Sequence, residues 1–200
     1  MHMENINKIY GLVLSGGKST RMGTDKGSIA YHNIPQRDYL YQLLEEVCDK
    51  VFLSIRPEQE AMLTGGKNLI LDKNEYKGPY NGLLSAHSQY PEVAWMVLAC
   101  DLPLIDLKAL HQLKANRNKN AWATAFATRE SGLPEPLAAI WEPVGLRESV
   151  QYLNEGNGTC PRKFLIRSNT TLVFPEEEHV LLNANSKEEY EAAVHKLNTI

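Results

Sequence analysis

The chain has 200 residues, of which 43% are hydrophobic and 22% are charged, as in an ordinary globular protein. Its net charge of −3 gives no overall basic field for binding nucleic acid or an acidic membrane. Three distant cysteines exclude a disulfide framework and zinc spacing, and no apolar run approaches the ~20 residues of a membrane span. The amino terminus lacks the apolar core of a signal peptide. We therefore expect one domain over residues 1–200, located in the cytoplasm.

The first expected element is a buried strand over Ile9–Leu14, which runs directly into a glycine-containing turn. The turn consists of Ser15, Gly16 and Gly17, and three cations follow it within nine residues: Lys18, Arg21 and Lys26. Adjacent glycines let backbone N–H groups approach a ligand closely, and the cations add positive charge. This combination predicts a polyphosphate site. It is not a Walker P-loop, whose spacing would require glycine at the position of Leu12.

Short apolar runs then alternate with helical patterns along the chain. Further strands are expected at Val51–Ile55, Asn68–Leu71, Trp95–Ala99, Ala121–Ala127, Leu137–Trp141 and Thr171–Phe174. Helices are expected around residues 39–47, over Tyr80–Gln89, around residues 107–113 with Asp106 as N-cap, and after Ser186, where Glu189 completes a capping box. The alternation predicts an α/β fold with a mostly parallel central sheet.

Two aspartates follow expected strands in the same way as the glycine turn follows the first strand. Asp72 comes after Leu69–Leu71, and Asp101 comes after Trp95–Ala99. Ligands of such sheets bind beyond the carboxyl ends of the strands, so we expect the turn and both aspartates to meet at one edge. Asp101 is then the candidate ligand for a divalent cation, which accepts one or two carboxylates together with phosphate oxygens. The alternative is a turn or helix-capping aspartate.

Several motifs carry a resemblance to a known family. Residues 14–26 match LxGGxSxRMGxDK, residues 78–85 resemble GPLxGxxS, residues 100–103 resemble CDxP, residues 134–138 resemble PxPLxA, and residues 183–189 resemble NxNTPEE. Together they resemble the molybdenum cofactor guanylyltransferases of the nucleotidyltransferase superfamily, over nearly the whole chain. The resemblance implies a single-domain, Rossmann-like, three-layer fold. It also implies a GTP-binding, magnesium-dependent transferase of molybdenum cofactor biosynthesis, which moves GMP from GTP to molybdopterin and releases pyrophosphate.

Site residues follow from the motifs and the resemblance together. The expected catalytic residues are Arg21, Lys26 and Asp101, with Asp101 also holding Mg²⁺. The expected nucleotide-binding residues are Leu14, Ser15, Gly16, Gly17, Lys26, Asp72, Gly78, Pro79, Gly82 and Asp101. Related cytidylyltransferases carry alanine at the position of Gly16, so the missing methyl is expected to leave room for a purine. Asp72 or a nearby carbonyl is expected to accept hydrogen bonds from guanine N1–H and its amino group, which adenine lacks as a pair.

The acceptor side is less defined. Asn183 and Asn185 are expected either to face the acceptor and assist the metal or to be ordinary loop asparagines. Arg162, Lys163 and Arg167 are interpreted as a solvated basic helix face rather than as a phosphate site. Departures from the family pattern, such as Lys187 in place of proline and Ser54 in place of a nucleotide-contacting asparagine, leave the identity of the acceptor and the ribose contacts undefined. Two other functions stay open. These are transfer to a sugar phosphate or another small phosphorylated acceptor, and GTP binding without catalysis. No nucleic-acid or membrane partner is expected.

Overall fold

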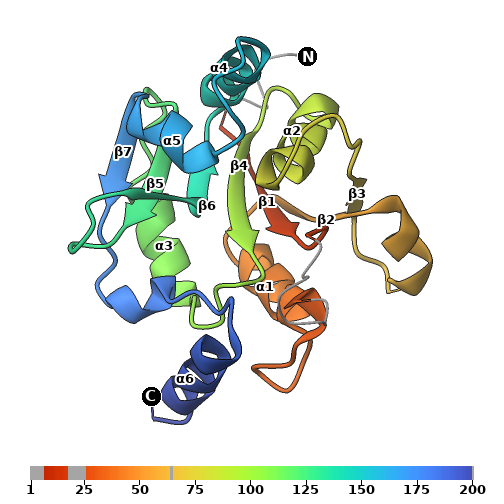
Figure 1. Cartoon of the computed structure of the whole chain (residues 1–200), viewed down its shortest axis with the longest axis vertical. Coiled ribbons are helices and arrows are strands. Elements are labelled where there is room, and N and C mark those ends of the chain that lie inside the picture. Colours follow the sequence, from red (N-terminus) through yellow and green to blue (C-terminus); the bar gives the residue numbers. More distant parts are fainter. Residues whose placement is uncertain (1–6, 18–25, 64, 200) are drawn as a thin grey trace.

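A seven-stranded sheet forms the centre of the molecule in the computed structural model, which describes residues 7–17, 26–63 and 65–199 (Figure 1). Its strands lie in the order β3-β2-β1-β4-β6-β5-β7. Their bounds are β1 (Ile9–Leu14), β2 (Lys50–Ile55), β3 (Leu69–Leu71), β4 (Ala94–Ala99), β5 (Ala123–Ala127), β6 (Pro134–Trp141) and β7 (Thr170–Val173). Only β6 runs against its neighbours. The expected α/β fold with a mostly parallel sheet is confirmed.

The register of the parallel half brings four strand ends to one edge. β1 lies between β2 and β4 and is parallel to both, with Leu12 opposite Phe52 on one side and Val97 on the other. β3 continues the parallel run beyond β2. Because β6 is antiparallel to β4, its first residue, Pro134, lies toward the same edge as the carboxyl ends of the other strands.

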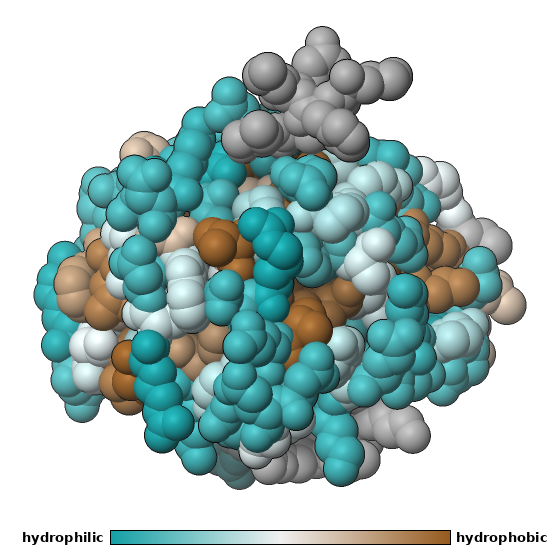
Figure 2. Space-filling view, turned by 90° about the horizontal axis from the view of Figure 1, so that it is seen from above, coloured by the Kyte–Doolittle hydropathy of each residue, from teal (hydrophilic) through white to brown (hydrophobic). Residues whose placement is uncertain are grey.

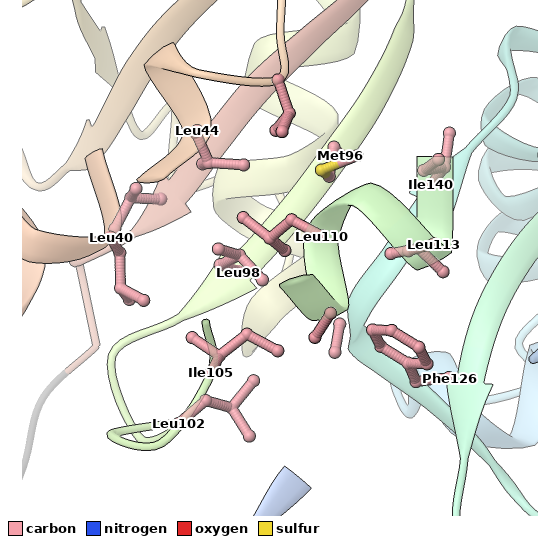
Figure 3. Packing of buried hydrophobic residues seen from close by; sticks show 14 of the residues in the cluster. Leu40, Leu44, Met96, Leu98, Leu102, Ile105, Leu110, Leu113, Phe126 and Ile140 are labelled. Carbon is pink, nitrogen blue, oxygen red and sulfur yellow. The ribbon is translucent and has the colours of Figure 1, made fainter. Parts of the chain in front are cut away.

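Helices cover both faces of the sheet and give three layers. The helices α1 (Gln36–Glu45) and α3 (Leu107–Ala115) pack on one face, and α2 (Pro79–Gln89), α4 (Pro143–Asn154) and α5 (Pro161–Ile166) pack on the other. Successive strand residues point to opposite faces, so Val13 enters the first cluster and Leu12 the second. Figure 3 shows the first cluster, where leucines of α1 and α3 surround Met96 and Leu98 of β4. Both faces are therefore buried, as a parallel sheet requires.

Most boundaries agree with the sequence pattern, and the differences have local reasons. The helix α4 was not predicted, because its buried residues are Gly145, Leu146 and Ser149, which give little apolar periodicity. Its start is marked only by Pro143 at the first helical position. β6 begins at Pro134, three residues before the predicted strand. The described residues also form three short 3-10 helices: η1 (Lys26–Ser28), η2 (Pro57–Met62) and η3 (Glu178–Leu181).

The two predicted helix caps are confirmed. The carboxylate of Asp106 accepts a hydrogen bond of 2.8 Å from the backbone N–H of Ala109 at the start of α3. At the start of α6 (Lys187–Leu197), the Ser186 hydroxyl accepts from the Glu189 N–H at 3.2 Å, and the Glu189 carboxylate accepts from the Ser186 N–H at 3.0 Å. Such caps satisfy N–H groups that the first helical turn leaves unpaired.

The face seen from above is largely hydrophilic, with small apolar areas separated by polar ones (Figure 2). Most of the large apolar side chains lie in the two clusters on either side of the sheet. Within the described ranges, no helix has the length and apolar character needed to cross a membrane.

Candidate functional site

A cavity of about 630 Å³ opens where the parallel strands end. Every residue predicted to bind the nucleotide lines it: Leu14, Ser15, Gly16, Gly17, Lys26, Asp72, Gly78, Pro79, Gly82 and Asp101. The segments that follow β1, β3 and β4 thus meet around one space, although nearly 90 residues separate the glycine turn from Asp101. Arg21, predicted as catalytic, and Lys18 lie outside the described residues.

The glycine turn is fixed by backbone and side-chain contacts on both sides. The N–H of Ser15 donates to the Ser54 carbonyl at 2.9 Å, which extends the pairing of β1 with β2. The carbonyl of Ser15 accepts from the side-chain amide of Gln59 at 3.3 Å. A Cβ built on Gly17 would meet nothing within 4 Å, so this glycine faces open space. The turn therefore presents free backbone surface to the cavity, as a phosphate site needs.

Gly16 has a different neighbour from the one expected. A Cβ added at Gly16 would lie 2.4 Å from Oδ2 of Asp72, closer than real Cβ atoms come to an oxygen. The space that the missing methyl leaves is therefore filled by the Asp72 carboxylate rather than left empty for a purine. This corrects the reason expected from the sequence. Gly82 plays a parallel part, since its Cβ would lie 2.2 Å from the Ser54 hydroxyl oxygen.

Asp72 is a buried and oriented carboxylate. Only 7% of the residue is exposed, and its Oδ1 accepts a hydrogen bond of 2.6 Å from the Ser54 hydroxyl. Burial raises the pKa of Asp72, and the hydrogen bond from Ser54, the charge of Arg56 and a hydrogen bond from Asn81 oppose that rise. The Ser54 hydroxyl consequently holds the carboxylate in one orientation at the wall of the cavity, and within the described residues Asp72 forms no ion pair.

Gly78 and Pro79 have clear structural roles beside Asp72. Gly78 has a φ of +64°, which strongly favours glycine, and Pro79 occupies the first position of α2, where its missing N–H is not needed. They begin the helix that brings Gly82 against Ser54. Gly78 and Pro79 therefore form the turn before α2, as expected. Their contact with the nucleotide stays a prediction.

Asp101 follows β4 and lies at the other end of the cavity. Its Oδ2 is 3.9 Å from Nζ of Lys26, and both side chains are 23% exposed. Burial raises the pKa of Asp101, and the positive charge of Lys26 lowers it. The negative charge of Glu189 raises it further. Asp101 lies in a turn, as one part of the alternative expected, but it does not cap α3, whose cap is Asp106. Asp101 thus keeps a partly exposed carboxylate oxygen in a charged environment.

The segment before α6 joins the site at this end. The N–H of Ala184 donates to the Asp101 carbonyl at 2.9 Å, and Lys26 donates to the side-chain oxygen of Asn185 at 2.5 Å. Figure 1 shows α6 at the end of the molecule toward which β4 points. Asn183 instead donates to the Leu181 carbonyl at 3.3 Å, within its own segment. The two predicted asparagines therefore separate, and Asn185 is the one in contact with a predicted catalytic residue.

The basic helix face has a more specific structure than the sequence suggested. Arg162 of α5 forms an ion pair of 2.5 Å with Glu135, whose side chain is 14% exposed, while Lys163 and Arg167 are exposed. Burial raises the pKa of Glu135, and the negative charge of Asp101 raises it further. The positive charge of Arg162 lowers it. Arg162 is thus bound to the first residues of β6, beside the Asp101 end of the cavity.

Sequence reasoning missed several lining residues, of which Arg56 is the most informative. The others are Gly27, Ser54, Asn74, Tyr76, Lys77, Asn81, Ala99, Cys100 and Leu137. Arg56 directly follows β2, so the rule that drew attention to Asp72 and Asp101 applies equally to it. A search for charged residues after every predicted strand would have found it.

The side chains at the Asp101 end of the cavity suit a cation that is coordinated mainly by the phosphates of a bound nucleotide and by water. Among the residues that the structure describes, no group of three or more histidine, cysteine or acidic side chains could hold a metal by itself. A single partly exposed carboxylate at Asp101 is compatible with a hard divalent cation that takes its remaining ligands from phosphates and water.

A mostly parallel sheet with a glycine turn after β1, a carboxylate after β4 and a cavity between them is the arrangement that the motifs predict for a nucleotidyltransferase. The sequence model of the MobA-like NTP transferase domain matches residues 11–171. The chain belongs to this family, and the prediction from the motifs is confirmed.

Individual relatives give the same result. The chain is 39% identical over 184 residues to the molybdenum cofactor biosynthesis bifunctional protein of Synechocystis, covering 91% of this chain but about half (52%) of that protein. It is 28% identical over 180 residues to a molybdenum cofactor guanylyltransferase of Pseudomonas fluorescens, covering 88% and 89% of the two chains. In fold it is similar to the molybdopterin-guanine dinucleotide biosynthesis protein A of Archaeoglobus fulgidus, with a TM-score of 0.78, 19% identity, and coverage of 96% and 100%.

Proposed function

We propose that this protein transfers GMP from GTP to molybdopterin and releases pyrophosphate. The observation that carries the proposal is the cavity itself, which places an oriented carboxylate at one end and a lysine–aspartate pair at the other. A guanine base and a triphosphate need these two environments. The relatives suggest the acceptor, since guanylyltransferases of the molybdenum cofactor align over most of the chain.

The proposed reaction needs no nucleophile from the protein. An oxygen of the acceptor's phosphate forms a bond to the α-phosphorus of GTP, while the bond to the β-phosphate's bridging oxygen breaks. The leaving pyrophosphate takes that electron pair. Catalysis then rests on positioning the two phosphates and stabilising the charge that develops.

Each part of the cavity has a proposed task. Backbone N–H groups of the glycine turn and the cation of Lys26 bind the triphosphate, and Arg21 adds a further cation. Asp101 would hold Mg²⁺, which would supply positive charge that neutralises the phosphates. Lys26 is held near Asp101 by Asn185, so the segment before α6 orients the cation that the phosphates meet. Asn185 and Asn183 are proposed for the acceptor side.

The proposed NTP-transferase domain is the whole chain, residues 1–200, although the family match ends at residue 171. Residues beyond that point contact the site, since the N–H of Ala184 donates to the backbone carbonyl of Asp101. Removing them would take away Asn185, to which Lys26 donates, and expose the Asp101 end of the cavity.

The direct test is an assay of pyrophosphate release from GTP and Mg²⁺ with molybdopterin and with a panel of sugar phosphates. We expect release with molybdopterin and its loss in the matched variant Asp101→Asn. Release with a sugar phosphate alone would move the enzyme to another acceptor. GTP binding without release from any acceptor would favour a binding module instead.

A further inference from the structure

The proposed GTP site leaves one edge of the guanine base without a protein partner. Guanine presents two donors, its N1–H and its amino group, and two acceptors, O6 and N7. A carboxylate such as Asp72 can accept from the two donors but cannot contact O6 favourably. A buried carbonyl oxygen without a donor would weaken binding, so a selective site should offer a donor beside Asp72.

Arg56 is a donor at this place. It lines the cavity together with Asp72, and its positive charge lowers the pKa of the Asp72 carboxyl, which places the two groups within electrostatic reach. The structure describes no ion pair between them. Both therefore retain hydrogen-bonding capacity toward a ligand.

The Arg56 side chain is itself incompletely satisfied. It is 25% exposed, and its buried Nε has no hydrogen-bond partner among the described residues. Its nearest opposite charge is Oε1 of Glu58, 3.6 Å from Nε, on a side chain that is 67% exposed. An exposed contact of this length is weak, so the guanidinium can turn to a ligand at small cost. A buried, unpartnered guanidinium nitrogen at a cavity wall indicates a missing acceptor.

The backbone of Arg56 is fixed relative to the glycine turn. Its N–H donates to the side-chain oxygen of Gln59 at 2.9 Å, and the amide of the same Gln59 donates to the Ser15 carbonyl at 3.3 Å. Gln59 is 7% exposed, so this bridge is protected from water. The Arg56 side chain therefore starts from a defined point beside the turn that is proposed to hold the phosphates.

We propose that Arg56 is a specificity residue whose guanidinium donates to guanine O6 and N7 while Asp72 accepts from N1–H and the amino group. This rests on the proposed use of GTP. Arginine is the side chain best suited to this pair of acceptors, because its planar fork matches their spacing. Sheet order favours the base over the phosphates as its target, since Arg56 and Asp72 follow β2 and β3 while Lys26 and Asp101 lie by β1 and β4.

The test measures binding of three nucleotides to wild type and Arg56→Met by titration calorimetry. The nucleotides are GTP, ITP, which lacks the amino group, and 2-aminopurine riboside triphosphate, which lacks O6 and the N1–H. We expect Arg56→Met to weaken binding of GTP and ITP at least about tenfold, and to weaken binding of the 2-aminopurine nucleotide, which keeps N7 but lacks O6, by a clearly smaller factor. Asp72→Asn should instead reduce the ratio of the affinity for GTP to the affinity for ITP, whereas Arg56→Met should leave this ratio unchanged.

Two further variants control for charge and fold. Lys119→Met removes one cation from the opposite edge of the sheet, where Lys119 contacts Asn7, and should bind all three nucleotides as wild type does. Arg56→Lys keeps the charge without the fork and should recover only part of the GTP affinity. Thermal unfolding identifies a variant that does not fold, and Arg56→Gln then replaces Arg56→Met.

The outcomes separate this inference from the proposed function. An equal loss of affinity for all three nucleotides would place the guanidinium on the phosphates and overturn the inference. Unchanged GTP affinity in a folded Arg56 variant would also overturn it, while a GTP-selective wild type would leave the proposed function standing. A wild type that binds ATP or CTP as tightly as GTP would refute both.

Discussion

The two ends of the cavity each contain a carboxylate that follows a strand, yet the two are held differently. Asp72 has a neutral hydroxyl donor at 2.6 Å and two glycines, Gly16 and Gly82, packed around the pair. Asp101 has a lysine at 3.9 Å and a backbone contact through its carbonyl, but no side-chain donor that closes on its carboxylate at hydrogen-bond distance in the described part of the chain. Burial raises the pKa of both.

This difference indicates different tasks. A carboxylate fixed by a short hydrogen bond can present its oxygen to a neutral base in one direction, which gives selectivity. A carboxylate that lies 3.9 Å from a lysine, without a short hydrogen bond to it, can accept a metal and lie beside charged phosphates. The base end is therefore predicted to govern which nucleotide binds, and the catalytic end how fast it reacts.

The largest predicted effect is at the catalytic end. Asp101→Asn should lower kcat for pyrophosphate release by at least ~10²-fold, because electrostatic stabilisation of this kind contributes a few kcal/mol to the transition state. GTP affinity measured without metal should stay within about threefold of wild type. Near wild-type turnover in a folded variant would remove Asp101 from the catalytic site.

The matching change at the base end should act on selectivity. Asp72→Asn replaces an acceptor oxygen with a donor nitrogen and should lower the ratio of kcat/KM for GTP over ITP by about tenfold or more. Steady-state rates with the two nucleotides give this ratio. If Asp101→Asn changes the ratio as much as Asp72→Asn does, the two ends are not separate in function.

The glycines around Asp72 offer a test of packing. Gly16→Ala should lower the free energy of unfolding by about 1–3 kcal/mol, because its methyl would overlap the Asp72 carboxylate. Gly17→Ala is the matched control, since its methyl enters open space, and should stay within about 0.5 kcal/mol of wild type. Urea unfolding measures both. Equal losses of stability would show that the turn needs glycine for its backbone conformation, and not to make room for the Asp72 carboxylate.

The smallest predicted effect concerns the Ser54 hydroxyl. Its hydrogen bond lowers the pKa of Asp72, so Ser54→Ala should raise that pKa further. A protonated Asp72 cannot accept both guanine donors, so GTP affinity is lost as pH falls through this pKa. The loss should therefore begin at a higher pH in the variant, and affinity at pH 7 should fall about threefold to tenfold.

Titration calorimetry of GTP between pH 4.5 and 8 measures this shift. Ser88→Ala is the control, because Ser88 is exposed on α2 and its hydroxyl only donates to the Ser85 carbonyl. An acid limit at the same pH in Ser54→Ala and wild type would mean that the hydroxyl does not tune Asp72.

Local patterns in the sequence determined the strands, most helices and the position of the site. Apolar runs predicted β1 and β4 to within a residue, because a strand buried on both faces needs a continuous apolar segment. The rule that ligands bind at the carboxyl ends of strands then predicted that the glycine turn, Asp72 and Asp101 would meet. These inferences depend on neighbours along the chain and on general topology.

Only the tertiary structure decided which groups touch. Lys26 and Asn185 are 159 residues apart in sequence, and no local pattern predicts their contact. The role of Gly16 could not be predicted from local sequence either. The atom that a methyl at this position would meet belongs to Asp72, which follows another strand. The bridge from Gln59 to the Ser15 carbonyl is likewise a product of packing between distant segments. Sequence periodicity determines which face of an element is buried, whereas the pairing of side chains across elements depends on how the buried faces fit together.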